Sequence, residues 1–460
     1  MLSPQDSLDL ALAVWNDSHR SELARLNRIK NALRTRQPSD PEMSVEIPDD
    51  APDVMRRLAR KAETNYLPLL VRTYRQALRV DGYLTKAPPE QSPWRWWEAN
   101  GLGARQSAIH DPVLRYGCAY VRVVPGVRNG HAVPAARIFD PFRMAAVYED
   151  ALDEWPVATV HQSGTGLVLT DATHEYSFGV RDERPIALRL ARPRRVSTAS
   201  YEFLGASAHE VGHCPVVRYR DSFLPDPDEG FGIVEPLIVV QQRIDETQYG
   251  QLVAQFFTAF QQRSVIGWVP ASEAEELKAS AARVWYVDAE PDSIRIQELK
   301  AGDLQGYAEA GSKARRDFAA IGQVAPGDIG VDSISNISDA TLAGLEASKN
   351  RRAGEIATSL GESHEQALRL MALIAGDMEA AADYASEVRW AEREARSWAG
   401  TVDGLVKLVQ AQVLSPDMAI EMVPGMTEQQ ARRAQDAQRR AQARASISAL
   451  TQSNADAVAR

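Results

Sequence analysis

The sequence predicts an α+β fold in which long helices surround a β-rich region. Hydrophobic residues recur at helical spacing in the first quarter of the chain, and short apolar runs separated by turns follow from residue 116 to residue 220. Long helical patterns return after residue 226 and dominate the remainder. A chain of 460 residues is too long for one simple core, so we expect two or more substructures.

The composition is that of a globular protein with an excess of acidic groups. The hydrophobic fraction of 44% and the charged fraction of 25% argue against extensive disorder. The formal net charge is −10, whereas a protein that grips DNA gains its affinity by neutralising phosphates and is usually basic. If this chain meets DNA, we expect it not to hold the DNA tightly.

Cysteine usage and apolar runs bear on the compartment. The two cysteines, Cys118 and Cys214, fit a reducing compartment and exclude a disulfide scaffold. The N-terminus lacks the basic stretch and apolar run of a signal peptide, and no apolar run is long enough to span a bilayer. We therefore expect a soluble protein that is made in a cytoplasm and has no membrane partner.

The first 115 residues are expected to be helical. Residues 5–36 carry apolar side chains at helical spacing, and two further helical stretches cover roughly residues 53–80 and 94–115. A linker rich in proline and aspartate, residues 38–52, separates the first two. The tryptophans of this part are interpreted as packing anchors, since aromatic side chains contribute large buried areas. They are Trp94, Trp96 and Trp97.

From residue 116 to residue 220 the pattern indicates a twisted antiparallel sheet or a small barrel. A long helix is then expected over residues 233–262, about 45 Å in length at the usual rise per residue. Its surface is rich in glutamine, and such a polar, mostly uncharged surface could lie beside a polyanion without strong attraction or repulsion. A solvated helix face is the alternative interpretation. A compact α/β insert at 264–299 and a second helix at about 303–322 complete an antiparallel pair with a small module at its tip.

The C-terminal part begins with a segment that breaks regular structure. Residues 324–336 contain Pro326, Gly327 and Gly330, and Ser338 is a plausible N-cap for the helix that follows. Uninterrupted to residue 375, that helix would be roughly 55 Å long, and Gly361 could kink or divide it. The last third is helical and ends in a tail rich in arginine.

The segment His209-Glu210-Val211-Gly212-His213 matches the H-E-x-x-H pattern of zinc hydrolases. In those enzymes the histidines lie one helical turn apart and the glutamate acts as a general base. Here a strand-like run follows Cys214 at once, glycine weakens a helix, and the pattern of a third ligand is missing. A zinc-dependent hydrolase therefore stays an alternative, and we predict no catalytic, metal or cofactor residues.

Two further patterns are weaker. The segment from Gly306 to Lys313 misses the phosphate-binding loop of ATPases, because Ser312 separates the second glycine from the lysine. We therefore expect any DNA movement to be powered by a partner. The arginine-rich tail is equally consistent with contact to nucleic acid and with a solvated or subunit-packing helix. Its candidate residues are Arg432, Arg433, Arg439 and Arg440.

The order of elements from residue 226 to residue 375 resembles the core of portal proteins of tailed double-stranded-DNA bacteriophages, of the siphophage type. The resemblance lies in GFGIVEPL before a long helix, the α/β insert, the returning helix, the Gly/Pro loop and the helix SNISDATLAGLEASKNRRAGEIATSL. The upstream GHCPVVRYRD is similar to the strand that precedes the first stem helix in that family. This gives the HEVGH segment a structural explanation.

The resemblance implies a ring-forming oligomer, dodecameric in the virion, at one capsid vertex. It implies a mainly helical wing, stem and crown, a β-rich wing subdomain and a small α/β clip. The implied segments are the wing at 1–228 with its β-rich part at 116–220, a stem helix at 229–261, the clip at 262–300, a second stem helix at 301–323, the tunnel loop at 324–338, the long wing helix at 339–400 and the crown at 401–460.

By the same resemblance the channel passes double-stranded DNA, without sequence specificity, during packaging and ejection. The implied partners are the terminase large subunit, the major capsid protein and the head–tail adaptor, and the implied locations are the portal vertex of the virion and the host cytoplasm during assembly. The tunnel loop contains acidic groups and no basic one, which would repel phosphate. Its candidate DNA-facing residues are Asp328, Asp332, Ser333 and Asn336. Another virion structural protein, such as an adaptor ring or scaffold, is the second alternative.

Overall fold

The computed structural model describes residues 1–36, 44–88, 91–128, 130–180, 201–225, 232–259, 263–266, 295–298, 304–331, 339–391, 398–423, 425–426 and 428–458. The chain divides into two compact units. Unit one comprises Met1–Arg28, Val71–Ile233 and Asn336–Arg460, and unit two comprises Ile29–Leu70 and Val234–Ser335. The predicted α+β class is confirmed at the level of a mixed helical and strand content.

The N-terminal part is largely helical, as predicted, but the stretch expected to be one helix over residues 53–80 is two helices followed by a strand at Val80–Leu84, and the stretch at 94–115 is also divided in two. Helix α1 (Pro4–Ala13) passes through a π-helical turn, η1 (Val14–His19), into α2 (Arg20–Leu33). Ser3 caps α1, because its side chain accepts the backbone N–H of Asp6 at 3.1 Å. In the π-helical turn the backbone hydrogen bonds span five residues instead of four. The extra residue changes which side chains of α2 face inward.

Unit one contains two antiparallel sheets in the predicted β-rich region. The larger has the strand order β10-β9-β8-β7-β6 and the smaller has the order β11-β2-β5. Both orders are linear among the described residues, so these are open sheets and not the barrel that the pattern also allowed. The strands are β2 (Cys118–Val124), β5 (Ala135–Phe139), β6 (Met144–Val147), β7 (Ala158–Ser163), β8 (Gly166–Thr170), β9 (His174–Val180), β10 (Tyr201–Ala208) and β11 (Val216–Arg220), with a short hairpin of β3 (Val127–Arg128) and β4 (His131–Ala132).

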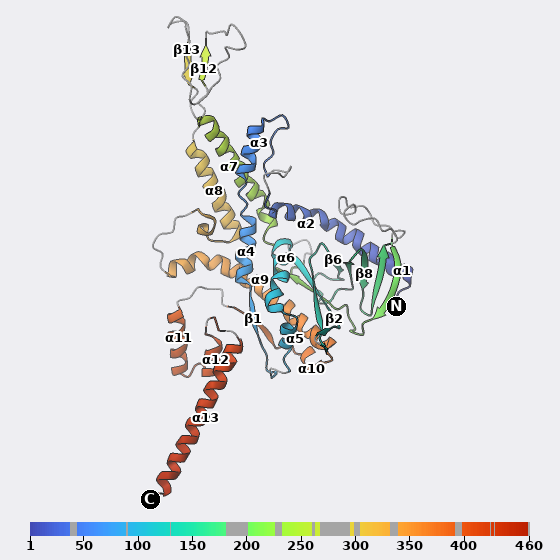
Figure 1. Cartoon of the computed structure of the whole chain (residues 1–460), viewed down its shortest axis with the longest axis vertical. Helices are drawn as coiled ribbons and strands as arrows, with labels where there is room; N and C mark the ends of the chain where they lie inside the picture. Colours follow the sequence, from blue (N-terminus) through green and yellow to red (C-terminus); the bar gives the residue numbers. More distant parts are fainter. Residues whose placement is uncertain are drawn as a thin grey trace. The chain divides into compact units, whose positions relative to one another are not determined.

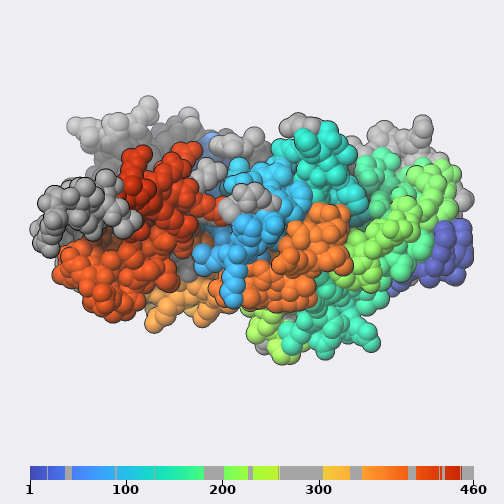
Figure 2. All heavy atoms as spheres, turned by 90° about the horizontal axis from the view of Figure 1, so that it is seen from below, coloured from blue at the N-terminus to red at the C-terminus, as the bar shows by residue number. Residues whose placement is uncertain are grey.

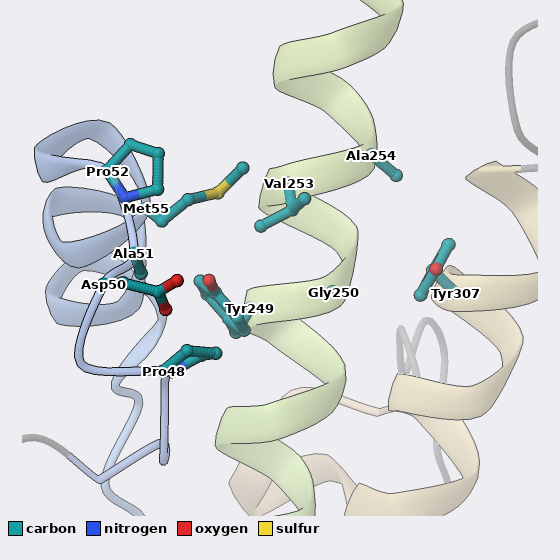
Figure 3. A pocket seen from close by; sticks show the side chains of 10 residues that line it. All are labelled: Pro48, Asp50, Ala51, Pro52, Met55, Tyr249, Gly250, Val253, Ala254 and Tyr307. Atoms are coloured by element: carbon teal, nitrogen blue, oxygen red, sulfur yellow. The ribbon is translucent and has the colours of Figure 1, made fainter.

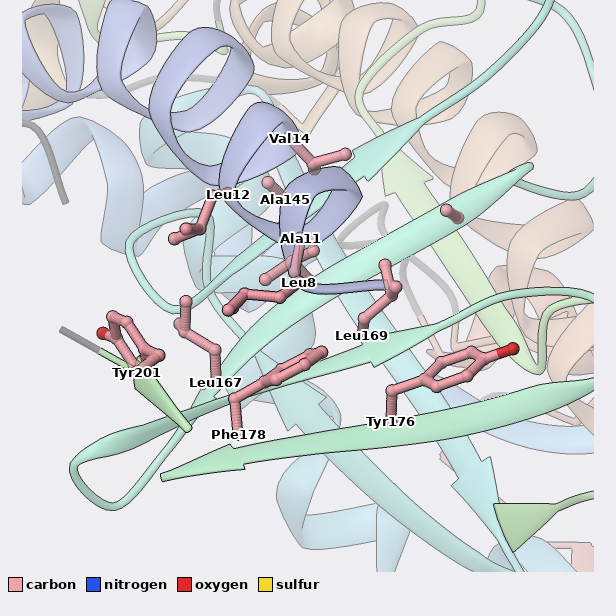
Figure 4. Packing of buried hydrophobic residues seen from close by; sticks show 12 residues of the cluster. Leu8, Ala11, Leu12, Val14, Ala145, Leu167, Leu169, Tyr176, Phe178 and Tyr201 are labelled. Carbon is pink, nitrogen blue, oxygen red and sulfur yellow. The ribbon is translucent and has the colours of Figure 1, made fainter. Parts of the chain in front are cut away.

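Helix α1 covers the five-stranded sheet with its apolar face (Figure 4). Leu8, Ala11 and Leu12 lie against Leu169 and Phe178, and all are buried. The first residues are also tied down by a polar contact, since the backbone N–H of Leu2 donates to the hydroxyl of Tyr176 at 2.9 Å. The N-terminus is therefore part of the core of this unit.

The remaining elements of unit one connect distant parts of the sequence. Strand β1 (Val80–Leu84) pairs antiparallel with β14 (Glu387–Trp390), although about 300 residues separate them. Figure 2 shows the blue residues around β1 directly beside the orange residues of this C-terminal part. The other elements are α5 (Trp94–Ala99), α6 (Leu102–Tyr116), α9 (Asp339–Ile374), α10 (Met378–Ala381), α11 (Trp398–Gln410), α12 (Pro416–Glu421) and α13 (Glu428–Val458).

The predicted long helix, α9, is one continuous helix of 36 residues. Gly361 does not divide it. Instead, the glycine lets β14 approach closely, because a Cβ at this position would lie 3.4 Å from Cγ2 of Val388. The tryptophans assigned to packing do pack: Trp94 and Trp97 stack with ring centroids 5.0 Å apart, and Trp97 meets His364 edge-on.

Unit two contains α3 (Asp53–Ala62), α7 (Ile238–Ala259), α8 (Leu304–Gly322) and the strand pair β12 (Arg263–Ile266) and β13 (Arg295–Glu298), while α4 (Leu67–Ala77) begins in it. The helix predicted from residue 233 is shorter than expected. A 3₁₀ turn, η4 (Glu235–Leu237), comes first, because Pro236 lacks an N–H and suits the first turn of a helix. The helix predicted inside the α/β insert lies outside the described residues.

In the part of the chain that the structure describes, no helix is both long enough and apolar enough to cross a membrane.

The contact of α1 with the five-stranded sheet can be tested by substitution. We expect Leu169→Ala to lower the free energy of unfolding by about 3 kcal/mol, because a fully buried leucine loses its packing and leaves a cavity. Leu152→Ala is the control, since this side chain is largely exposed and should change stability by less than about 0.5 kcal/mol. Urea unfolding of both variants measures the difference, and equal effects would contradict the assigned core.

Candidate functional site

Helices α7 and α8 run side by side in unit two and are joined at one end by the β12–β13 pair (Figure 1). Arg243 on α7 and Asp317 on α8 form an ion pair with Nη2 and Oδ2 2.8 Å apart. The helices also meet at Gly250, where a Cβ would lie 2.9 Å from Cε1 of Tyr307. The predicted antiparallel helical pair is therefore present, with a strand pair between its two helices in the sequence, and glycine suits its close approach. The rest of the predicted insert lies outside the described residues.

A polar clamp holds residues 63–66, between α3 and α4, against α7. The amide of Gln241 donates to Thr64 O at 2.8 Å and accepts the N–H of Tyr66 at 2.9 Å. The carboxylate of Asp245 accepts the N–H of Thr64 at 3.0 Å and the amide of Gln241 at 3.1 Å. These side chains are only 5% and 2% exposed, respectively. The solvated-face interpretation of the glutamines is therefore wrong for Gln241, which satisfies backbone groups that have no ladder partner.

Burial dominates the electrostatics of this clamp. It raises the pKa of Asp245 to about 6, and the hydrogen bond from the backbone of Thr64 opposes that rise only in part. No sequence pattern indicated a buried carboxyl here, because Asp245 lies in a polar stretch of the helix.

A groove of about 490 Å³ lies beside this clamp, between α3, α7 and α8 (Figure 3). Tyr249 faces Pro48 and Asp50, while Met55 points toward Val253. The lining is mostly apolar and consists of Pro48, Asp50, Ala51, Pro52, Met55, Tyr249, Gly250, Val253, Ala254 and Tyr307. Unit two therefore presents an open apolar hollow beside its helical pair.

The predicted tunnel loop is described only in its first half. It forms a short 3₁₀ helix, η6 (Pro326–Ile329), that ends at Gly330 with φ 71°, a conformation that suits glycine. Ile329 is buried and anchors the turn, whereas Asp328 is exposed to solvent. Asp332, Ser333 and Asn336 lie outside the described residues, so the grouping of these four residues stays a prediction.

The four tail arginines lie on α13. Arg433 and Arg440 are exposed, and Arg432 is half-buried. Arg439 forms an ion pair with Asp417 of α12, with Nη2 and Oδ2 3.1 Å apart. Part of the positive charge expected to meet nucleic acid is therefore already offset by the neighbouring helix.

The HEVGH segment is a turn between β10 and β11, and it has no helix. Glu210 adopts φ 55° and Gly212 adopts φ 87°, both in the left-handed region. The Nε2 of His209 lies 3.0 Å from Asp171 O, whereas the ring of His213 stacks on Trp155 with centroids 3.8 Å apart. The geometry that zinc hydrolases need from this motif is not formed. Among the described residues, no group of three or more potential ligands is arranged to hold a metal ion.

A buried relay of side chains crosses the core of unit one and was not indicated by the sequence. His110 Nδ1 lies 3.1 Å from Leu78 O, His110 Nε2 lies 2.8 Å from His364 Nε2, and His364 Nδ1 lies 3.1 Å from the hydroxyl of Tyr219. Leu78 O can only accept, so His110 Nδ1 donates to it. With both imidazoles neutral, His364 Nε2 then donates to His110 Nε2, and the hydroxyl of Tyr219 donates to His364 Nδ1. Burial lowers the pKa of His110 to about 4, which agrees with the neutral form.

Comparison with known proteins assigns the class. Residues 14–444 match the family described as "Phage portal protein, SPP1 Gp6-like". The chain therefore belongs to this family of phage portal proteins, as its sequence pattern predicted. No curated protein matches the chain.

Solved structures similar to this chain include one from the "Virion of native gene transfer agent (GTA) particle", with 14% identity, a TM-score of 0.46 and coverage of 82% of this chain and 95% of that chain. A second is from the "Neck of empty GTA particle computed with C6 symmetry", with 14% identity, a TM-score of 0.45 and coverage of 84% and 97%. A third is from the "Neck of native GTA particle computed with C12 symmetry", with 14% identity, a TM-score of 0.41 and coverage of 82% and 94%.

The buried carboxyl of the clamp gives a pH dependence that can be measured. A pKa of about 6 in the folded chain exceeds the value of about 3.9 of an unfolded aspartate, so the stabilising protonated form is lost as pH rises through this window. Asp245→Asn keeps the Oδ1 acceptor without the charge. The difference in free energy of unfolding between this variant and the wild type should therefore grow in favour of the variant by about 2–3 kcal/mol as the pH rises from 4 to 7.

Urea unfolding followed by circular dichroism at each pH measures this difference. Glu246→Gln is the matched control, because Glu246 is exposed on the next position of the same helix. A difference between Asp245→Asn and the wild type that stays constant from pH 4 to pH 7 would contradict the assigned burial.

Proposed function

We propose that this chain is the subunit of a ring at one capsid vertex, through which double-stranded DNA enters and leaves. The family match over residues 14–444 carries this proposal, because it spans both compact units and the helical pair. In the proposed ring, α7 and α8 form the stem, the segment 262–300 forms the clip, and the segment 324–338 forms the tunnel loop. Residues 1–228 and 339–400 form the wing, and residues 401–460 form the crown.

Ring assembly needs subunit contacts, and the helical pair offers apolar surface for them. Val239 on α7 is 72% exposed and Ile321 on α8 is 53% exposed. The groove beside Tyr249 adds further uncovered apolar lining. We propose that neighbouring subunits, twelve in the virion, cover these surfaces, since large exposed apolar patches usually mark contact sites.

The charge of the chain suits a channel through which DNA slides. Asp328 is exposed, and the sequence from residue 324 to residue 338 contains no basic residue. Twelve copies of a chain with a net charge of −10 carry about −120 formal charges, so counterions and ionic strength must influence DNA passage. An acidic loop repels phosphate and prevents the DNA from adhering to the wall.

The chain belongs to a structural family, and we propose that a partner supplies the energy for packaging. In this proposal the terminase large subunit docks on the clip during packaging and a head–tail adaptor replaces it afterwards. The major capsid protein contacts the wing, and the assembled ring resides in the virion after assembly in the host cytoplasm. The turn geometry of HEVGH favours this structural role over the hydrolase alternative.

The loop charge predicts the effect of charge reversal. Asp328→Lys combined with Asp332→Lys should slow packaging in a reconstituted reaction with terminase, because lysines beside the DNA attract its phosphates. Ring assembly should persist, since Asp328 is exposed. The matched control is Asp328→Asn with Asp332→Asn, which removes the charge without reversing it and should slow packaging less. Wild-type velocity in the lysine variant would refute the role assigned to the loop.

The crown arginines predict a salt-dependent contact with DNA. In the double variant Arg433→Gln/Arg440→Gln, the slope of the logarithm of DNA affinity against the logarithm of salt concentration should become less steep by about 2. Each lost phosphate contact contributes about 0.9 to this slope. Replacing both by lysine keeps the charge and should keep the slope. Fluorescence anisotropy with a labelled duplex over a salt series measures both. An unchanged slope in the glutamine variant would exclude these residues from DNA contact.

A further inference from the structure

A cavity of about 170 Å³ lies in unit one, where α2, β2, β6 and β11 meet. The strand register explains its chemistry. Arg220 is paired with Cys118 and Arg218 is paired with Tyr120, so these four side chains stand on one face of the three-stranded sheet. The turns of η1 and α2 that carry His19, Glu22 and Arg25 line the cavity from another side.

The lining is unequal in charge. Three guanidinium groups, those of Arg25, Arg218 and Arg220, share the cavity with one carboxylate, that of Glu22. Glu22 accepts from Arg25 Nε at 3.0 Å and is itself half-exposed to solvent. Outside the lining, the buried carboxylate of Asp221 pairs with Arg352 of α9 at 3.4 Å, and Asp140 adjoins the lining residue Pro141. The lining therefore carries a net positive charge inside a partly enclosed space.

Polar atoms at this site also lack partners. His19 is 4% exposed, and its Nε2 lies 2.9 Å from Phe142 O while its Nδ1 has no hydrogen-bond partner. The Nε of Arg218 is likewise buried without a partner, although its Nη2 donates to Ala151 O at 2.6 Å. Phe142 O can only accept, so Nε2 of the neutral His19 ring carries the hydrogen and Nδ1 is an unpaired acceptor, whereas the Nε–H of Arg218 is an unpaired donor. Burying such groups unsatisfied is costly, so a ligand or solvent that supplies both a hydrogen and acceptor oxygens, as a protonated oxyanion does, would stabilise the site.

We propose that this cavity binds a small tetrahedral oxyanion of the phosphate type. Guanidinium groups recognise such oxygens in a planar, two-pronged geometry, which favours arginine over lysine. The volume corresponds to about six waters at roughly 30 Å³ each, and it is smaller than the roughly 300 Å³ at which sites for larger organic ligands begin. The size therefore favours a free anion over a nucleotide. A backbone phosphate of a DNA duplex carries the same kind of oxygen atoms and is the alternative ligand.

Cys118 gives a reporter inside the site. It lines the cavity, whereas Cys214, the other cysteine of the chain, is fully buried elsewhere. The experiment measures the rate of iodoacetamide alkylation at Cys118 in the full chain by peptide mass spectrometry, while inorganic phosphate is titrated at constant ionic strength. Phosphate should slow alkylation in a saturable manner, with chloride as the reference anion.

Three substitutions on one helix sharpen the test. Arg25→Gln should weaken phosphate protection by about tenfold, because a charged hydrogen-bond donor is lost. Glu22→Gln should strengthen it several-fold, because the only carboxylate of the lining is removed. Arg28→Gln is the control, because Arg28 lies one turn further along α2, is exposed and does not line the cavity. The protection curve of this variant should match that of the wild type.

Two outcomes would overturn the proposal. The first is a failure of the phosphate test: either phosphate gives no saturable protection of Cys118, or the protection curves of Glu22→Gln and Arg28→Gln are the same. Glu22 is exposed, so this comparison holds even if Arg25→Gln fails to fold. The second is protection by a DNA duplex at a phosphate concentration where inorganic phosphate gives none, which would assign the site to the nucleic-acid backbone. Neither outcome depends on ring assembly, so the result is separate from that of the proposed channel.

Discussion

The seating of α9 on the three-stranded sheet holds unit one together. The hydroxyls of Ser359 and Ser363 donate to carbonyl oxygens of β11, and His364 joins Tyr219 of the same strand to His110 of α6. One turn of this helix also supplies Glu365, whose carboxylate accepts the N–H of Val388 in β14. Ser363, His364 and Glu365 are buried, so each must find its partner within the protein, and Ser359 is half-buried. The middle of α9 therefore specifies where β11, α6 and β14 lie, which apolar contacts alone would leave less defined.

Unit two uses the same device on a smaller scale. The buried side chains of Gln241 and Asp245 of α7 satisfy the backbone between α3 and α4. In both units a long helix carries the polar groups that position shorter segments. In the proposed ring this arrangement would resist displacement, because moving one segment would leave buried polar groups without partners.

Much of the fold could be predicted from the sequence, since its long helices and alternating strands have clear periods. The positions of α7, α8, α9 and the β-rich region follow from that pattern, and the order of these elements indicated the family. The pattern failed where a long-range contact decides the role of a residue. Asp245 and His364 are buried by segments that are distant in the sequence, which no local pattern indicated. The turn conformation of HEVGH agrees with the sequence argument against a zinc-binding helix there. Of the candidate site, Asp328 is exposed, and its place beside DNA stays a prediction. The arginine cavity depends on strand register and on η1 and could not be predicted.

The central claim is that copies of this chain assemble into a ring with an open axis. Electron microscopy of the purified protein, with class averages viewed down the particle axis, tests it most directly. The account predicts closed rings with a central hole wide enough for duplex DNA. Monodisperse monomers across the accessible range of protein and salt concentrations would contradict it.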